Sequence, residues 1–365
     1  MKRVLGIISA NYSTEDLGPL TENRTIASLP FGGRYRLIDL PLSNMINAGI
    51  DTVGLVMPYK YRSIIDHVGA GKEWGLDRKN GGLCILPGTV FGVNTVHHRF
   101  LIRDLKRNLA FLKRSARPFV LLTAASFVNN MDYEKLVEAH IESGADITMA
   151  VKTADRDNDD LRSVELKKGR VSGFGSGVHP GDTAFLDCFV INHKTLLEII
   201  DAYDAVNYMD FFDAVARELD RLIVGTYEFT GYTCEIHSKE SYFRASQELL
   251  DASVRRELFD PERPITTKIM DAVPTKYGED AEVENSLIPA GCEIGGKVKN
   301  SVLFRGVTVE PGAKVKNSII MQNCTIRKDA KIENAIVDRY NVIGEGTVVK
   351  GTSKDIFVMS KYNKW

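Results

Sequence analysis

Cysteine is scarce in this sequence, and the few that occur exclude two kinds of cross-linked domain. They are odd in number, scattered along the chain and without any CxxC pair: Cys84, Cys188, Cys234, Cys292 and Cys324. Neither a disulfide framework nor a zinc site fits that distribution, so we interpret each as a small buried side chain. A reducing cytoplasm is the location that this pattern predicts.

Long apolar runs and an excess of charge are also missing. The apolar run at residues 4–8 is too short for the core of a signal peptide or for a membrane span, and we interpret it as a first buried strand. The 47 basic residues nearly balance the 48 acidic ones, which leaves a formal net charge of −1. With no general attraction for polyanions, the sequence predicts neither nucleic acid nor a membrane as a partner.

Roughly the first 240 residues alternate apolar strands with amphipathic helices. Strands are predicted at residues 4–8, 52–57, 119–123, 146–151, 185–191 and 222–228. Helices are predicted at residues 101–113, 133–143 and 193–203, and a further helix at about 239–258. This order predicts an α/β domain with a mainly parallel sheet flanked by helices, whose ligands lie at the carboxyl ends of the strands.

A second pattern begins after about residue 280, where aliphatic residues recur at steps of six. Three sets follow one another at intervals of 17 residues: Leu303, Val309 and Val315; Ile320, Ile326 and Ile332; Val337, Ile343 and Val349. Three six-residue faces per coil, each with one aliphatic side chain pointing inward, make a triangular prism. The repeat predicts a C-terminal left-handed parallel β-helix, which should pack on the first domain or on another subunit.

A proline-rich stretch separates the two patterns. Pro261, Pro264 and Pro274 occur within fourteen residues, which suits an extended linker better than a packed element. We therefore divide the chain into an α/β domain at residues 1–245, a helix and linker at 246–280, and a β-helix with its tail at 281–365.

Two long motifs stand out in the first domain. Residues 17–44 read LGPLTENRTIASLPFGGRYRLIDLPLSN, and residues 67–87 read HVGAGKEWGLDRKNGGLCILP. These blocks resemble bacterial glucose-1-phosphate adenylyltransferase (ADP-glucose pyrophosphorylase), whose family shows PLT, PFGGKYRIIDFPLSN and HIGxGxPWDLDRxxGGVxILP. The resemblance implies a nucleotidyltransferase-like first domain followed by a β-helix. Members of that family convert ATP and glucose 1-phosphate to ADP-glucose and pyrophosphate in glycogen synthesis.

The phosphate-binding loop of that family is altered in this sequence. The family's AGGxGxRLxPLT aligns with ANYSTEDLGPLT at residues 10–21, so the glycines are lost and Asp16 replaces the arginine. A carboxylate about 4 Å from a phosphate costs about 4 kcal/mol at an effective dielectric near 20. Ile26 stands where the family's RAKP has its lysine. We expect no productive triphosphate binding in this mode.

The metal and sugar-phosphate positions are altered as well. The aspartate of the family's SGDHIYKMDY corresponds to Ser126, and the aspartate of GYWxDVGT corresponds to Glu235, which keeps the charge. The EKP motif is missing around Ser176, and the serine of ASMGIY corresponds to Phe185, which we expect to fill the sugar pocket. Because a hydroxyl is a poor ligand for Mg²⁺, no cofactor is expected on this chain, and Mg²⁺ only on a catalytic partner.

The resemblance implies a subunit that has lost catalysis. Some bacteria pair a catalytic adenylyltransferase with a non-catalytic, regulatory subunit, and this chain would join such a partner in a heterotetramer and alter its activity allosterically. The alternative is a weakly active nucleotidyltransferase with an atypical phosphate loop, which turnover by the chain alone would reveal. An acyltransferase on the β-helix is disfavoured, since no histidine follows His237.

Basic residues mark one further hypothetical site. Arg34 and Arg36, in GGRYR, match basic positions near the activator site of the family and suggest a sugar-phosphate effector site. A predicted helix adds positive charge through Arg99, Arg103, Lys106, Arg107 and Lys113. The alternative for these residues is a solvated basic face.

Overall fold

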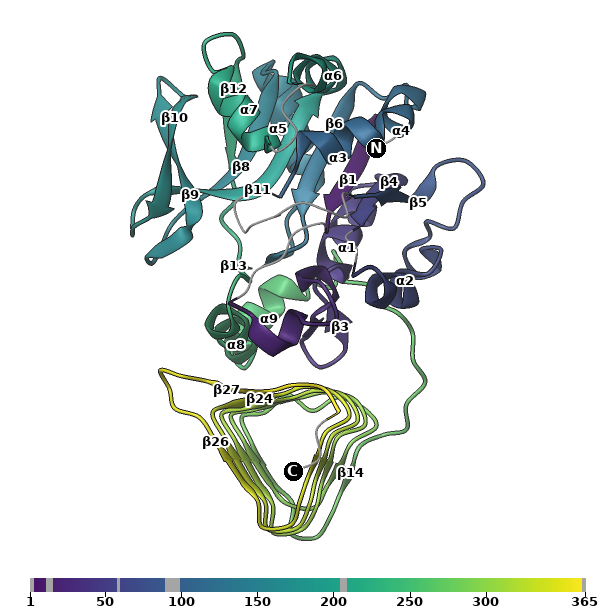
Figure 1. Ribbon diagram of the computed structural model, residues 1–365, viewed down its shortest axis with the longest axis vertical. Helices are drawn as coiled ribbons and strands as arrows, with labels where there is room; N and C mark the ends of the chain where they lie inside the picture. The colour runs from purple at the N-terminus through teal and green to yellow at the C-terminus, as the bar shows by residue number, and fades with distance from the viewer. Residues whose placement is uncertain (1–2, 11–15, 58–59, 89–98, 204–208, 363–365) are drawn as a thin grey trace.

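The computed structural model consists of two packed parts joined by an extended segment (Figure 1). It describes residues 3–10, 16–57, 60–88, 99–203 and 209–362. The first part is an α/β domain, and the second is a coil of short strands that Figure 1 shows as stacked triangles. None of the helices in these ranges has the length and the apolar character needed to cross a bilayer.

A mixed sheet forms the centre of the α/β domain. Its strands are β1 (Val4–Ser9), β4 (Thr52–Met57), β5 (Gly82–Pro87), β6 (Phe119–Ala124), β8 (Ile147–Thr153), β9 (Asn158–Lys167), β10 (Arg170–Val178), β11 (Thr183–Asn192) and β12 (Val224–Glu228). They run in the order β10-β9-β11-β6-β1-β4-β5, and β8 pairs with β11 and β12. β1 is parallel to β4 and β6, whereas β11 is antiparallel to β6 and β8. The predicted mainly parallel sheet is confirmed.

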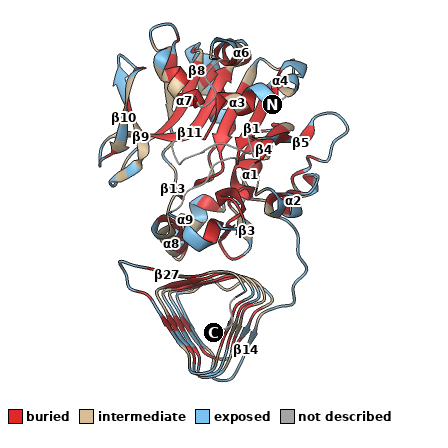
Figure 2. Ribbon diagram, viewed as in Figure 1, coloured by how far each residue is buried: buried red, intermediate tan, exposed pale blue. Residues whose placement is uncertain are grey.

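Helices cover both faces of this sheet, because successive side chains of its strands point to opposite sides. Leu5 and Ile7 of β1 point into one apolar core, and Val4 and Ile8 point into the other. The first core contains residues of α3 (Ile102–Arg107), α4 (Leu109–Arg114), α6 (His193–Ala202), α7 (Phe211–Arg217), α8 (Lys239–Glu248) and α9 (Ala252–Leu258). The second contains residues of α1 (Asp39–Asn47), α2 (Arg62–Val68) and α5 (Tyr133–Ser143). Figure 2 shows the buried centre of the sheet in red.

The C-terminal part is a left-handed β-helix with three parallel faces. The first face is β14 (Lys276–Tyr277), β16 (Glu293–Ile294), β19 (Thr308–Val309), β22 (Thr325–Ile326) and β25 (Val342–Ile343). The second is β15 (Glu282–Glu284), β17 (Lys297–Lys299), β20 (Lys314–Lys316), β23 (Lys331–Glu333) and β26 (Val348–Lys350). The third is β18 (Val302–Leu303), β21 (Ile319–Ile320), β24 (Ala335–Val337) and β27 (Phe357–Met359). The nine aliphatic residues predicted to point inward are at most 3% exposed, as the repeat requires.

Asparagines form one corner of the prism. Asn300, Asn317 and Asn334 have φ angles of 48°, 45° and 51°, the left-handed region that asparagine tolerates better than most residues. The side-chain amide of Asn317 donates to the side-chain carbonyl of Asn334 at 3.4 Å. Each corner thus repeats the one before it, which keeps the coils in register.

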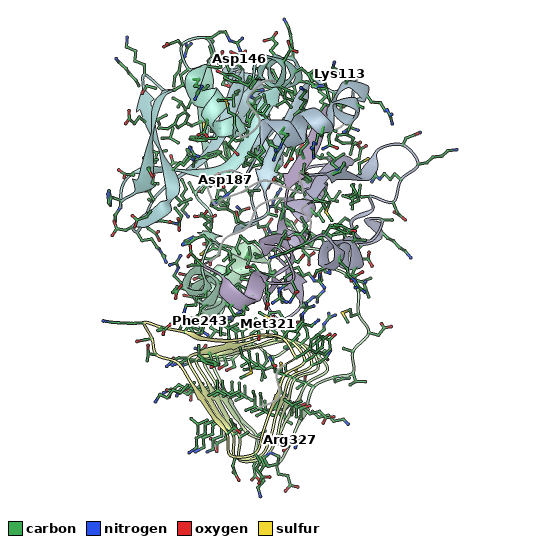
Figure 3. The ribbon with its side chains drawn as sticks, viewed as in Figure 1. Lys113, Asp146, Asp187, Phe243, Met321 and Arg327 are labelled. Carbon is green, nitrogen blue, oxygen red and sulfur yellow. The ribbon has the colours of Figure 1, made fainter. Side chains whose placement is uncertain are left out.

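The third face of the β-helix packs against the α/β domain. Val302, Ile319 and Ile336 point outward from that face and join the core of the α/β domain. Figure 3 shows Met321 at this junction. A buried ion pair also crosses it, with the guanidinium of Arg24 2.6 Å from the carboxylate of Asp338. The two parts are therefore one packed unit.

Two predicted helices are interrupted in the structure. The predicted helix at 101–113 breaks at Asn108, whose side chain donates to the carbonyls of Asp104 and Pro87 and so competes with the helical backbone. The predicted helix at 239–258 breaks before Asp251, whose carboxylate accepts from the N–H of Ser253 and begins α9. The hairpin of β9 and β10 was not predicted, because its bulges and glycines obscure the period of two.

Candidate functional site

The two positions that align with metal ligands of the resembling family meet at the carboxyl edge of the sheet. Ser126 follows β6, and Glu235 ends β13 (Thr233–Glu235), which pairs with β7 (Phe127–Asn129). The N–H of Ile236 donates to the carbonyl of Ser126 at 2.9 Å. The fold therefore brings these predicted site residues together.

Glu235 is fully engaged by groups of this chain. One carboxylate oxygen is paired with the guanidinium of Arg99, and the other accepts from the side chain of Asn158 at 3.2 Å. His237 lies 3.5 Å from Glu235, and its other ring nitrogen lies 3.1 Å from Asp160. Burial by itself raises the pKa of Glu235, but Arg99 and His237 outweigh burial and hold that pKa at about 2. The carboxylate is thus ionised and already neutralised.

Arg99 does not belong to a basic helix, contrary to the sequence prediction. It precedes α3, is 6% exposed and forms a second ion pair with Asp187 of β11. Its carbonyl accepts from the hydroxyl of Ser9, at the end of β1. The N–H of the next residue, Phe100, donates to the buried carboxylate of Asp210 at 2.6 Å. These contacts fix the guanidinium between β11 and β13.

A divalent metal ion does not fit this arrangement. Mg²⁺ prefers oxygen ligands with negative charge. Ser126 supplies a neutral hydroxyl, which has no hydrogen-bond partner among the described residues, and both oxygens of Glu235 are occupied. Within the described ranges, no group of three or more His, Cys, Asp or Glu side chains could hold a metal ion.

The sugar-phosphate positions are placed differently from the prediction. Phe185 is 1% exposed and packs with Phe189 and Phe212, at centroid distances of 4.7 and 5.5 Å. Its neighbours Ala184 and Leu186 line the cavity beside Glu235 instead, because they face the other side of β11. Phe185 therefore fills the core of the domain rather than that cavity. Ser176 is exposed on β10.

The cavity beside Glu235 is small. Its volume is about 70 Å³ among the described residues, and Lys152, Arg156 and Arg244 contribute to its lining. Pockets for ligands of ordinary size measure about 300–1,000 Å³. Among the described residues, this cavity is therefore smaller than a pocket that would enclose a nucleotide.

The phosphate-loop positions are only partly covered. Residues 11–15, where the lost glycines lie, are outside the described residues. Asp16 is exposed, and its carbonyl accepts from the N–H of Lys239 at 3.1 Å. Ile26 is 2% exposed and belongs to the apolar core, where a lysine ammonium would be costly to bury.

The two basic residues of the predicted effector site lie in different surroundings. Arg34 is exposed beside Tyr35, whereas Arg36 is partly buried and donates to Ser63. Arg36 lines a pocket of about 710 Å³ between the α/β domain and the β-helix. The charged side chains of this interdomain pocket are Arg24, Arg36, Arg62, Arg339, Lys361, Glu22, Asp66 and Asp338, five basic against three acidic. Burial, followed by repulsion from Arg339, lowers the pKa of Arg36 to about 10.

Asp187 is a site residue that sequence reasoning missed, and Arg99 was assigned to a basic helix rather than to this site. Asp187 has a φ of 47°, in the left-handed region, and stands in the glycine position of the family's ASMGIY. A carboxylate in place of a glycine is the one local signal that could have drawn attention to it. No motif or spacing in the sequence predicts that Asp187 pairs with Arg99, because the two residues are far apart in the chain.

Comparisons with known proteins agree with this architecture. A nucleotidyl transferase family model matches residues 6–161, and a model described as GlmU-like, C-terminal hexapeptide matches residues 270–355. Glycogen biosynthesis protein GlgD of Bacillus subtilis (strain 168) is 34% identical over 98% of this chain and 96% of its own length. Glycogen biosynthesis protein GlgD of Geobacillus stearothermophilus is 36% identical over 84% of this chain and 81% of its own length.

A third relative carries the name of the enzyme. Glucose-1-phosphate adenylyltransferase of Clostridium perfringens (strain SM101 / Type A) is 33% identical over 84% of this chain and 81% of its own length. The chain therefore belongs to the glucose-1-phosphate adenylyltransferase family, which includes relatives named glycogen biosynthesis protein GlgD.

Proposed function

We propose that this chain is a non-catalytic, regulatory subunit of glucose-1-phosphate adenylyltransferase, which modulates ADP-glucose synthesis for glycogen formation. Similarity to two proteins named for glycogen biosynthesis and to one named for the adenylyltransferase supports the pathway. Its partner would be a catalytic homologue in a heterotetramer, and Mg²⁺ would bind there. The free thiols of its described cysteines are in keeping with a cytoplasmic location.

The observation that carries the proposal is the state of Glu235. Nucleotidyl transfer needs carboxylates free to hold Mg²⁺ against the triphosphate. Here the remaining carboxylate is bound by Arg99 and Asn158, and the neighbouring position is the hydroxyl of Ser126. A subunit without turnover can still act on a partner, because differential contacts worth about 1–3 kcal/mol shift a conformational equilibrium.

Pyrophosphorolysis of ADP-glucose tests this proposal directly. The chain is assayed alone with Mg²⁺ and pyrophosphate, and is then titrated into the catalytic homologue of the same organism. We expect no turnover by the chain alone, and a change in the partner's rate or effector response that saturates at a fixed ratio of subunits. Turnover by the chain alone that disappears in Glu235→Gln would contradict the proposal and favour an active enzyme.

The interdomain pocket is the proposed place for a phosphorylated effector. Basic side chains outnumber acidic ones in it, and burial followed by repulsion from Arg339 lowers the pKa of Arg36, so a bound phosphate would stabilise the charged guanidinium. Arg36→Gln should weaken binding of glucose 1-phosphate or inorganic phosphate about tenfold, the effect of losing one charge-assisted hydrogen bond. Arg34→Gln is the matched control, since Arg34 is exposed and does not line the pocket. Calorimetric titration measures the affinity of both variants, and equal losses of affinity would exclude this pocket as the binding site.

A further inference from the structure

The place where the fold would hold a metal ion contains a positive charge of the chain itself. The guanidinium of Arg99 lies against Glu235 on one side and against Asp187 on the other. Its centre is 5.8 Å from the ring centroid of Phe127, the residue next to Ser126. It therefore occupies the space beside Glu235, one of the two family metal-ligand positions. Figure 3 shows Asp187 near the middle of the α/β domain.

This ion cluster is buried, which sets it apart from surface pairs of the same chain. The side chains of Arg99, Asp187 and Glu235 are 6%, 14% and 0% exposed. Two carboxylates that close to each other in a buried setting need a cation between them.

The cluster also joins elements that are otherwise separate. Asp187 belongs to β11 of the central sheet, at a register shift between Phe185 and Phe189. Glu235 belongs to β13, which forms a separate two-stranded sheet with β7. The backbone of Arg99 is held by Ser9 of β1. A cation at this point therefore ties together three segments of the domain.

We propose that Arg99 is a built-in replacement for the divalent metal ion, which makes the folded state of this chain independent of metal. The guanidinium neutralises Asp187 and Glu235 and connects β11 to β13, as a bound cation would. A metal ion can enter only if the guanidinium leaves. This inference concerns the folded state of the chain alone, so unfolding experiments on the chain alone test it. It would still stand if the chain proved not to be a regulatory subunit.

Thermal unfolding of the full chain, with millimolar Mn²⁺ or with EDTA, tests the replacement. For the unaltered chain, we expect the two Tm values to agree within about 1 °C, since no ligand binds the native state. Arg99→Met removes the guanidinium from between two buried carboxylates, so its Tm in EDTA should fall. Mn²⁺ should then recover at least half of that loss by taking the vacated position.

Arg162→Met is the matched control. Arg162 also pairs with a carboxylate, that of Asp213 at 2.9 Å, and its guanidinium lies 4.1 Å from the ring centroid of Phe212. Its removal should lower Tm without creating any response to Mn²⁺. If Arg99→Met does not give folded protein, Arg99→Gln takes its place, because the amide keeps a hydrogen-bond donor and leaves the same two carboxylates.

Binding of Mn²⁺ is measured as loss of the free-Mn²⁺ signal in electron paramagnetic resonance, and variants show where the ion binds. Arg99→Met, or Arg99→Gln, should bind Mn²⁺, and the same variant combined with Glu235→Gln should not. Stabilisation of the unaltered chain by Mn²⁺ that EDTA reverses would overturn the replacement. Absence of any Mn²⁺ response in the folded Arg99 variant would do the same.

Discussion

At the scale of single residues, Asp187 combines an unfavourable backbone with a favourable ion pair. A left-handed φ costs most residues other than glycine about 1–2 kcal/mol, although aspartate and asparagine tolerate it better. Asp187 keeps a φ of 47° because its carboxylate reaches the guanidinium of Arg99. The ion pair made by this side chain thus offsets the free-energy cost of the backbone conformation.

Substitutions of Asp187 separate these two effects. Asp187→Ala loses the ion pair and keeps the strained φ, whereas Asp187→Gly loses the pair but relieves the strain. Urea unfolding should rank the unaltered chain as the most stable and the alanine variant as the least, with about 1 kcal/mol between alanine and glycine. A glycine variant as stable as the unaltered chain would mean that the ion pair contributes nothing net.

Glu235 should make stability depend on pH. Its folded pKa of about 2 lies below the ordinary value of 4.5, so the unfolded chain binds the proton first as the pH falls. The stabilisation is complete well above pH 4.5 and is lost progressively as the pH falls toward 2. It amounts to about 3 kcal/mol from the size of that shift.

Glu235→Gln reveals this contribution. At neutral pH the variant should be less stable than the unaltered chain, and urea unfolding at successively lower pH should show the difference shrinking below pH 4.5. A constant difference across that range would show that Glu235 has the same pKa in both states.

At the scale of elements, the β-helix depends on its corners as much as on its aliphatic core. Asn317 has a φ of 45°, and its N–H donates to the carbonyl of Lys299 on the previous coil at 3.0 Å. The corner conformation is therefore repeated from coil to coil by backbone hydrogen bonds. A residue that resists that conformation should weaken the coil.

Asn317→Ala should lower the free energy of unfolding by about 1 kcal/mol or more, because alanine adopts the left-handed region poorly. Asn317→Gly should cost less, since glycine adopts that region freely. Lys314→Ala serves as the control, because Lys314 is an exposed residue on the same coil. Guanidinium unfolding measures all three, and equal stability of the alanine and glycine variants would refute a conformational origin.

At the scale of the whole molecule, the backbone of the α/β domain lies close to the β-helix at Gly33. A β-carbon added there would lie 2.8 Å from the side chain of Leu287 and 3.1 Å from the carbonyl of Leu303, both in the β-helix. Gly33 also has a φ of 79°. Glycine is thus needed at this junction for both space and backbone conformation.

Gly33→Ala should therefore destabilise the molecule more than Gly144→Ala. Gly144 ends α5 with a left-handed φ of 60° but has nothing within 4 Å of an added β-carbon, so it isolates the effect of crowding between the two parts. Alanine costs about 1–2 kcal/mol at either position for its φ alone, and crowding adds to that at Gly33. Denaturant unfolding measures the loss in free energy of unfolding for each variant. Equal losses would show that the junction widens to accommodate the added methyl group.

Much of the architecture followed from local sequence patterns. The strands predicted at residues 52–57 and 119–123 and the helix at 133–143 lie where the structure has β4, β6 and α5. The helix breaks at Asn108 and Asp251 were missed, because capping depends on which partner a polar side chain finds. Phe185 was expected to fill the sugar pocket, but it faces the apolar core with Phe189, because alternate residues of β11 point to opposite faces of the sheet.

The sequence by itself determined the β-helix. Its six-residue period places the same kind of side chain in the same position on every coil, so each residue is specified by near neighbours. Only the tertiary structure decided the state of the candidate site. Arg99, Asp187 and Glu235 are far apart in the chain and meet because β1 and β13 end near the register shift of β11. The strength of their ion pairs comes from burial, which no local pattern encodes.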